Sequence, residues 1–323
     1  MIVGARKPSV ATMRAARHRQ WGAPLEIGDA PRPEPAAGEV RIAVQATSVN
    51  PIDMYTGRNS GYEQSMRLPF IPGWDVAGVV DALGYGVTRH AVGDRLYGLV
   101  SFPYPGGTYA QFLTAPAHQL TATPATASFA AAGCLPMAAL TAWQMLDAAR
   151  VAPGQRILVS GASGGVGHVA VQLARARGAD VVALARVRDH ATLYELGATE
   201  CIDYTDLRAV GEIAQVDALV DLVGHEFGRS LFGRVAPGGT VVLSTAWSVP
   251  TYRDDAEEYG IRARACLVEP DAAALAHIAA LFDAGRLRVI VGATYHLAQA
   301  AEAQSWVTQR RGPGKVAIVT EET

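Results

Sequence analysis

The feature that most constrains this chain is a glycine-rich junction between an apolar run and a helical pattern. In ILVSGASGGVGHVAVQLA, a short buried strand, predicted from Ile157 to Ser160, leads directly into GASGGVG, residues 161–167. The helical segment that follows has one apolar face, made of Val166, Val169, Ala170, Leu173 and Ala174, and Gly178 ends it. Because glycine has no Cβ, such a loop can turn sharply and lie close to a ligand. This order of strand, loop and helix is typical of a dinucleotide-binding corner.

The loop itself predicts a pyrophosphate site. Unpaired amides and the helix dipole both favour negative phosphates at a helix start. We expect Gly161, Gly164 and Gly167 to turn the chain and Gly165 to allow close approach, with Ser163 and Val166 completing the cofactor contacts. The spacing departs from a strict GxGxxG pattern, so the alternative is an ordinary strand–turn–helix corner.

The end of the next strand predicts which dinucleotide binds. Enzymes that use NAD place Asp or Glu about 20 residues further on, against the ribose 2′-hydroxyl. Here Arg186 stands near that position, in VVALARVRDH, and Arg188 is a second candidate. Arginine can pair with a 2′-phosphate, which a carboxylate would repel, so we predict NADPH rather than NADH. Two alternatives stay open, that Asp189 binds the hydroxyl or that both arginines are merely solvated.

The remaining sequence predicts two different regions. Short β-rich runs at residues 13–22, 40–49, 73–83, 93–100 and 108–115 alternate with Gly/Pro turns, and residues 1–12 are expected to be an extension. A helical pattern over 129–149 is interrupted or begun at Pro136. Apolar strands at 181–185, 201–203, 218–223 and 240–245 then alternate with helical segments, including 188–196 and an Ala-rich helix, 271–284, capped by Asp271. This alternation is typical of a parallel sheet with helices on both faces.

Composition excludes several other classes of protein. The formal net charge of −2 argues against a nucleic-acid groove, which needs a positive field. The three cysteines lie far apart without a CxxC pair, which excludes a four-cysteine zinc lobe. We find no apolar run of membrane-spanning or signal-peptide length, so we expect a cytoplasmic protein that enters no membrane.

Ten segments occur in an order and spacing that match one known family. They are SVNPIDMYTG, PFIPGWDVAGVV, VGDRLYG, GTYAQF, LPMAALTAWQML, GASGGVG, ELGATECIDY, VDALVDLVG, VAPGGTVV and GKVAIV. From residue 13 to 319 the chain resembles the zinc-independent quinone oxidoreductase branch of the medium-chain dehydrogenase/reductase superfamily. The resemblance implies an α/β protein with a GroES-like β-rich catalytic domain, residues 13–130 and 285–323, and a Rossmann NADPH-binding domain, residues 131–284.

Departures from the zinc-containing relatives bear on the chemistry. Zinc alcohol dehydrogenases carry a Cys ligand near Asn50 and a His-Glu pair where this chain has Trp74 and Asp75. A catalytic zinc needs three suitable protein ligands, and tryptophan is not one. We therefore predict chemistry without a metal, with Trp74 narrowing the cleft.

The resemblance also implies which residues line the substrate site. Asn50, Tyr55 and Tyr62 match cleft positions, where the carboxamide or a phenol could donate a hydrogen bond to developing charge. Alternatively, Asn50 only shapes the turn before Pro51 and the tyrosines only form walls. Asp53, Asp75, Asp94 and Arg95 are interpreted as framework residues.

Further cofactor contacts are expected around the same sheet. The resemblance puts Thr141 at the nicotinamide ring, Tyr204 near the adenosine ribose or its phosphate, and Lys315 within reach of a phosphate or capping a surface strand. Gly224, Ser244 and Thr245 follow strands, where ligands gather in open α/β sheets. His168 is expected to face outward from its helix.

Three functions stay open at this point. The first is NADPH-dependent hydride transfer to a quinone or activated enone, and the second is reduction of a 2-enoyl thioester of an acyl or polyketide chain. The third, of another class, is a noncatalytic NADPH-binding sensor or structural protein. RARACLV, residues 262–268, resembles the edge strand through which relatives pair their sheets, so a homodimer is expected.

Overall fold

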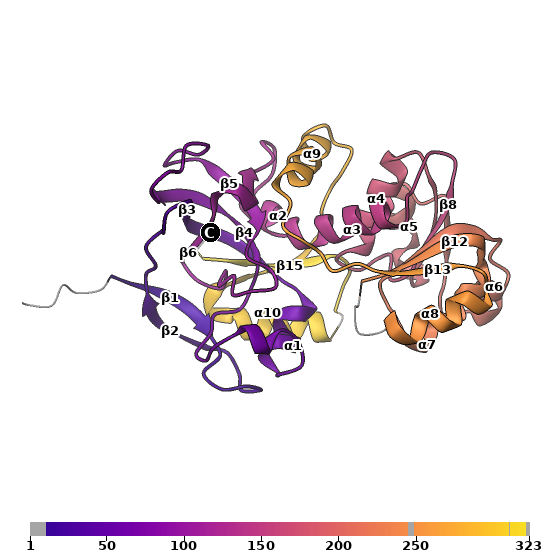
Figure 1. The fold of residues 1–323 in the computed structure, drawn as a ribbon, viewed down its shortest axis with the longest axis horizontal. Helices are drawn as coiled ribbons and strands as arrows, with labels where there is room; N and C mark the ends of the chain where they lie inside the picture. Colours follow the sequence, from indigo (N-terminus) through magenta and orange to yellow (C-terminus); the bar gives the residue numbers. More distant parts are fainter. Residues whose placement is uncertain (1–10, 245–248, 310, 321–323) are drawn as a thin grey trace, which may run out of the picture.

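The computed structural model describes residues 11–244, 249–309 and 311–320. Two large sheets lie side by side along the long axis of the molecule (Figure 1). Residues 1–10 of the expected N-terminal extension and Thr245 lie outside the described residues.

The second half of the chain forms a six-stranded parallel sheet with the order β10-β9-β8-β11-β12-β13. Its strands are β8 (Arg156–Val159), β9 (Asp180–Leu184), β10 (Glu200–Ile202), β11 (Val216–Asp221), β12 (Val235–Leu243) and β13 (Arg262–Ala265). The helices that accompany them are α3 (Pro136–Ala148), α4 (Gly167–Ala176), α5 (Val187–Glu195), α6 (Leu207–Gly211), α7 (His225–Ser230), α8 (Val249–Glu258) and α9 (Ala272–Asp283).

Successive side chains of these strands enter two different cores. Ile157 and Val159 of β8 pack with residues of α3, α4 and α9, whereas Leu158, between them, packs with residues of α6 and α8. Because strand side chains alternate between faces, both faces of the sheet are covered by helices. The predicted α/β class with a Rossmann-type parallel sheet is confirmed.

The first half of the chain forms an antiparallel-rich sheet that the end of the chain joins. The order is β14-β15-β3-β4-β5-β7, and β6 also pairs with β3. Its strands are β3 (Glu39–Val49), β4 (Asp75–Leu83), β5 (Arg95–Leu99), β6 (Phe112–Pro116), β7 (Leu120–Ala122), β14 (Val291–His296) and β15 (Lys315–Val319). Figure 1 shows β15, in yellow, beside the purple strands, and it runs antiparallel to β3.

Smaller elements complete this β-rich half. They are the hairpin β1 (Thr12–Arg17) and β2 (Glu26–Pro31), with α1 (Pro51–Gly57), α2 (Phe129–Gly133) and α10 (Ala300–Thr308). Among the described residues, no helix is long and apolar enough to cross a bilayer.

Direct contacts join the two halves through α9. The Tyr97 hydroxyl of β5 donates to the Leu275 carbonyl of α9 at 2.6 Å. At the other end of the helix, the Asp283 carboxylate accepts the backbone N–H groups of Ala125 and Thr126. These bonds attach α9 to the β-rich half of the chain, and Figure 1 shows α9 close to α3.

Local sequence signals account for several element ends. Asp271 caps α9 through a bond from the Ala274 N–H at 2.9 Å, as predicted. The helical pattern over 129–149 divides into α2 and α3, and Pro136 opens the second helix. By contrast, β11 ends at Asp221 rather than at 223, because the Asp221 carboxylate accepts the N–H groups of Val223 and Gly224 and turns the chain.

Candidate active site

The glycine loop between β8 and α4 presents unpaired amides. Gly161 turns the chain with a φ of +64°, a conformation that favours glycine. Bonds from Ala162 N–H to the Leu184 carbonyl and from Gly164 N–H to the Gly161 carbonyl hold the turn. Within the described residues, no hydrogen bond is recorded from the N–H groups of Ser163, Gly165, Val166 and Gly167. These donors, at the start of a ten-residue helix, are suited to phosphate oxygens.

Close packing also limits the other glycines of the loop. Gly164, Gly165 and Gly167 have no positive φ, and the Gly164 N–H bond to the Gly161 carbonyl contributes to the turn. A Cβ on Gly167 would lie 2.2 Å from the Gly161 carbonyl oxygen. A Cβ on Gly165 would lie 2.9 Å from Cδ of Lys315. The loop therefore needs glycine chiefly because backbone and the Lys315 stem approach it closely.

His168 does not face outward, so that expectation is wrong. Its side chain is fully buried, its Nδ1 lies 2.8 Å from the Gly164 carbonyl, and its Nε2 accepts the Ile290 N–H at 3.0 Å. Burial, together with the nearby charges of Lys315 and Arg288, lowers the pKa of His168 to about 4. The neutral ring links the glycine loop to the segment that leads into β14.

Two predicted cofactor residues meet at the ends of neighbouring strands. Arg186 follows β9 and Tyr204 follows β10; Nε of Arg186 donates to the Tyr204 hydroxyl at 2.8 Å. The guanidinium lies 5.4 Å from the centre of the Tyr204 ring. Asp203 accepts the Val187 N–H nearby, and bonds from Thr205 hold the pKa of Asp203 below its usual value. In the described residues, no bond is recorded for Nη1 or Nη2 of Arg186, so both can meet an anion.

Arg188 and Asp189, the charged residues that follow Arg186, differ in exposure. Arg188 is exposed, and its Nε lies 3.8 Å from Oδ1 of Asp189. The Asp189 side chain is largely buried, and it lines a small cavity together with Ser163 and His168 beneath the glycine loop. Arg188 therefore stays a prediction as a phosphate ligand, and Asp189 stays the alternative for a ribose hydroxyl.

A buried carboxylate organises the carboxyl ends of β8 and β11. The Asp221 carboxylate accepts the Ser160 hydroxyl at 2.6 Å and the N–H of Gly224 at 3.1 Å. Gly224 has a φ of +71°, and the N–H of Ser244 bonds to the Asp221 carbonyl. Thr141 is buried in α3. The cofactor contacts predicted for Thr141, Gly224 and Ser244 stay predictions.

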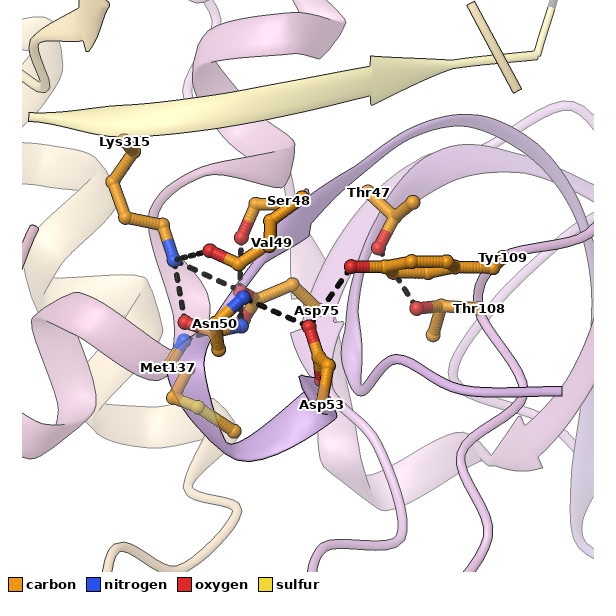
Figure 2. Close-up of polar contacts among 10 residues, drawn as sticks. All are labelled: Thr47, Ser48, Val49, Asn50, Asp53, Asp75, Thr108, Tyr109, Met137 and Lys315. Atoms are coloured by element: carbon orange, nitrogen blue, oxygen red, sulfur yellow. Dashed lines mark hydrogen bonds and ion pairs between the residues drawn. The ribbon is translucent and has the colours of Figure 1, made fainter. Parts of the chain in front are cut away.

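Asn50 lies in a buried polar network with Lys315 and Asp75 (Figure 2). Nζ of Lys315 donates to Oδ1 of Asn50 at 2.5 Å and lies 3.5 Å from Oδ2 of Asp75. Nδ2 of Asn50 donates to the same Asp75 oxygen at 2.8 Å. Asp75 also accepts the Ser48 hydroxyl and the Met137 N–H, and its carboxylate is fully buried. This network, called the Lys315–Asn50–Asp75 network below, joins β15, β3, β4 and α3.

Asp53 forms a second buried group next to this network. Its Oδ2 accepts the Asn50 N–H at 2.8 Å and the Tyr109 hydroxyl at 3.0 Å, while Oδ1 has no recorded partner in the described part of the chain. Burial raises the pKa of Asp53 to about 7, and the negative charge of Asp75 contributes. Asp53 thus fixes the backbone at the start of α1, on which Asn50 depends.

The two candidate tyrosines differ in exposure. Tyr55 is about half exposed, and Tyr62 is partly buried and packs edge-to-face on Phe102 at 5.2 Å. Burial raises the pKa of Tyr62. Trp74 is buried; its indole N–H donates to the Tyr104 carbonyl at 2.6 Å, and its ring contacts Phe102 edge-to-face. The roles expected of the two tyrosines stay predictions.

Sequence reasoning assigned Asp75 to the framework and did not single out Asp221 or Ser48. A buried carboxylate at the end of an otherwise apolar strand, as in VDALVD, is a signal that would have identified Asp221. No group of three His, Cys, Asp or Glu side chains is placed to hold a metal ion within the described ranges.

Comparisons with known proteins agree with this architecture. Residues 36–125 match the alcohol dehydrogenase GroES-like domain, and residues 196–318 match the zinc-binding dehydrogenase family. The quinone oxidoreductase of Rattus norvegicus is 31% identical over 242 residues, which are 72% of each chain. The pikromycin polyketide synthase component PikAII of Streptomyces venezuelae is 34% identical over 88% of this chain, which spans only 8% of that protein.

A solved structure supports the same assignment. The quinone oxidoreductase from Coxiella burnetii superimposes with a TM-score of 0.92 at 31% identity, over 96% of this chain and 100% of that one. The fold, the glycine loop and these similarities agree. The chain belongs to the quinone oxidoreductase branch of the medium-chain dehydrogenase/reductase superfamily.

Proposed function

We propose that this protein is an NADPH-dependent reductase of quinones or activated enones. The observation that carries the proposal is the set of unpaired amides at the start of α4, with Arg186 at the end of the neighbouring strand β9. Amides at a helix start suit a pyrophosphate, and a guanidinium with two unengaged nitrogens suits a 2′-phosphate. The residues present therefore fit a nicotinamide dinucleotide.

The proposed roles divide between binding and chemistry. The loop residues Ser163 to Gly167 would hold the pyrophosphate, and Arg186 with Tyr204 the adenosine end. A reduced nicotinamide supplies a hydride when it is bound. The protein must then stabilise the negative charge that develops on the acceptor oxygen, and Asn50 is the proposed donor, with Tyr55 and Tyr62 as further candidate donors.

The test is an NADPH-oxidation assay with a benzoquinone, an α,β-unsaturated ketone and an enoyl thioester, run in parallel with NADH. We expect faster turnover with NADPH. Arg186→Ala should raise the KM for NADPH tenfold or more and leave that for NADH within twofold, whereas exposed Arg208→Ala serves as the matched control. Equal loss with both cofactors would assign Arg186 a structural role, and preference for NADH would reject the cofactor choice.

A second candidate substrate is an enoyl thioester of a polyketide or acyl chain. The similarity to PikAII over 88% of this chain favours it. A higher kcat/KM with the enoyl thioester than with the quinone would support this candidate. NADPH binding without turnover of any of the three acceptors would instead favour a noncatalytic sensor or structural protein.

A further inference from the structure

Lys315 touches both parts of the proposed site. Its stem packs against the glycine loop, where a Cβ on Gly165 would approach Cδ of Lys315 to 2.9 Å. Just before it, the Gly314 N–H donates to the Ser163 carbonyl at 3.1 Å. Its ammonium group, however, reaches Asn50 Oδ1 at 2.5 Å and the Val49 carbonyl at 3.4 Å (Figure 2). The side chain is buried, so the charge is directed into the Lys315–Asn50–Asp75 network.

This arrangement allows only one orientation of the Asn50 carboxamide. An ammonium group can only donate hydrogen bonds, and an ionised carboxylate can only accept them. Oδ1 must therefore face Lys315 and Nδ2 must face Asp75, as Figure 2 shows. One N–H of Nδ2 is used by Asp75, and no partner for the other is recorded among the residues that the structure describes.

The same contacts change the chemistry of the amide. A charge-assisted bond to Oδ1 draws electron density from the amide nitrogen, which makes its remaining N–H a stronger donor. A fixed, polarised donor stabilises charge that appears during a reaction without having to reorient.

We propose that Lys315 is a positioning residue that fixes and polarises Asn50, so that the second N–H of Nδ2 binds the carbonyl oxygen of the hydride acceptor. The inference rests on the proposed reductase function. Hydride adds to the β-carbon of an acceptor whose C=C bond is conjugated with a carbonyl. The hydride would come from the reduced nicotinamide, which is oxidised. The π pair of the C=C bond then forms the C=C bond of an enolate, and the π pair of the carbonyl moves to its oxygen. That oxygen becomes the oxyanion that Asn50 binds, and solvent later supplies a proton to the α-carbon. The acceptor class is therefore conjugated carbonyl compounds.

The rival role for Lys315, a direct phosphate ligand, makes opposite predictions. In Lys315→Met, we expect kcat for the enone to fall 10- to 100-fold while the Kd for NADPH, measured by its fluorescence, stays within twofold. Exposed Arg286→Met, which removes a positive charge elsewhere, should change neither quantity. A tenfold weaker NADPH affinity with kcat retained would overturn the proposal in favour of phosphate binding.

A double-mutant comparison tests whether Lys315 acts through Asn50. If it does, Lys315→Met combined with Asn50→Ala should be no slower than Asn50→Ala alone. If the losses of kcat in the two single variants multiply in the double variant, Lys315 and Asn50 act independently and the proposal is wrong. Because Lys315→Met leaves the Asp75 charge buried without its cation, thermal unfolding is measured for each variant. Lys315→Met combined with Asp75→Asn removes both charges and should fold while still losing kcat.

A readout without turnover separates this inference from the proposed function. The ¹⁵N–¹H signals of the Asn50 carboxamide, assigned by their loss in Asn50→Ala, should exchange slowly with solvent in the wild type and faster in Lys315→Met. If the carboxamide protons exchange at the same rate in both proteins, Lys315 does not position Asn50. A wild-type protein that reduces no conjugated carbonyl removes the proposed function and, with it, the acceptor contact.

Discussion

At the scale of single residues, two buried groups near Lys315 titrate in opposite ways. Burial lowers the pKa of His168 to about 4 and raises the pKa of Asp53 to about 7. Each shift favours the neutral form, because charge is poorly solvated in the interior. A pH profile of the whole protein sums both effects, so each group must be isolated by a variant.

The first prediction isolates His168. Its pKa is lowered in the folded state, so between about pH 6.5 and 4 the unfolded chain binds more protons and the folded state loses stability as the pH falls. The difference in unfolding free energy between the wild type and His168→Gln should shrink by roughly 3 kcal/mol from pH 7 to pH 4. Urea unfolding at several pH values measures it, and a constant difference would contradict the assigned burial.

The positions of residues at strand ends could be predicted from the sequence. Positions that depend on contacts with segments far away in the sequence could not. Arg186 follows an apolar strand, which predicts its position, and the family resemblance implies that of Tyr204; Nε of Arg186 lies 2.8 Å from the Tyr204 hydroxyl. His168 was misassigned because the chain that covers it comes from Ile290, 122 residues away. The engagement of Lys315 with Asn50 spans 265 residues and was hidden for the same reason.

At the scale of elements, the corner between β8 and α4 depends on close contact of two backbone segments. A Cβ on Gly167 would lie 2.2 Å from the Gly161 oxygen and 2.7 Å from Cα of Ala162. Neither atom can move without opening the turn.

We therefore predict that Gly167→Ala lowers the free energy of unfolding by about 2–4 kcal/mol, since a methyl group is forced into packed backbone. Gly211→Ala in α6 is the matched control: nothing lies within 4 Å of its Cβ position, and the change should stabilise by about 0.5 kcal/mol. Thermal and urea unfolding of both variants decide the matter. Equal stability of the two would refute the packing argument.

The outer strand β13 carries a prediction about assembly. It pairs with β12 on one side and is the last strand of its sheet, as the sequence resemblance led us to expect. Unpaired strand edges favour pairing with another copy. Sedimentation equilibrium should give twice the mass of one chain.

Proline variants locate that contact. Successive N–H groups along a strand point to opposite sides, so of Ala263→Pro and Arg264→Pro one disrupts pairing with β12 and the other removes an N–H at the open edge. The second variant should stay folded and become monomeric. If both variants keep the dimeric mass, the dimer uses another surface.

Individual helices and strands were easier to predict from the sequence than the elements they pack or pair with. The helices α4, α5 and α9 and the strands β8 to β12 follow from local apolar patterns, whereas β13 was expected from the family resemblance. The strand β14 was not predicted, because its sequence, VGATYH, alternates weakly and its place beside β15 is set by tertiary contacts.

At the scale of the whole molecule, ligand binding should stabilise both halves together, because α9, Lys315 and the His168–Ile290 bond join them. NADPH at 100 times its Kd should add about 2.7 kcal/mol to the unfolding free energy. NADH at the same concentration should add less, and Arg186→Ala should reduce the effect of NADPH selectively. Differential scanning calorimetry provides the measurement, and identical shifts with both dinucleotides would argue against 2′-phosphate recognition.

The pairing of β15 with β3 also determines when this sheet can be completed during protein synthesis. Val49 and Lys315 are 266 residues apart, so the edge of β3 from Ala46 to Val49 stays bare while the whole parallel sheet is still being translated. At typical rates of synthesis this wait lasts roughly 15–50 s. During that interval the exposed edge is open to chaperones or to wrong partners, and Asn50 cannot contact Lys315 until β15 has been translated.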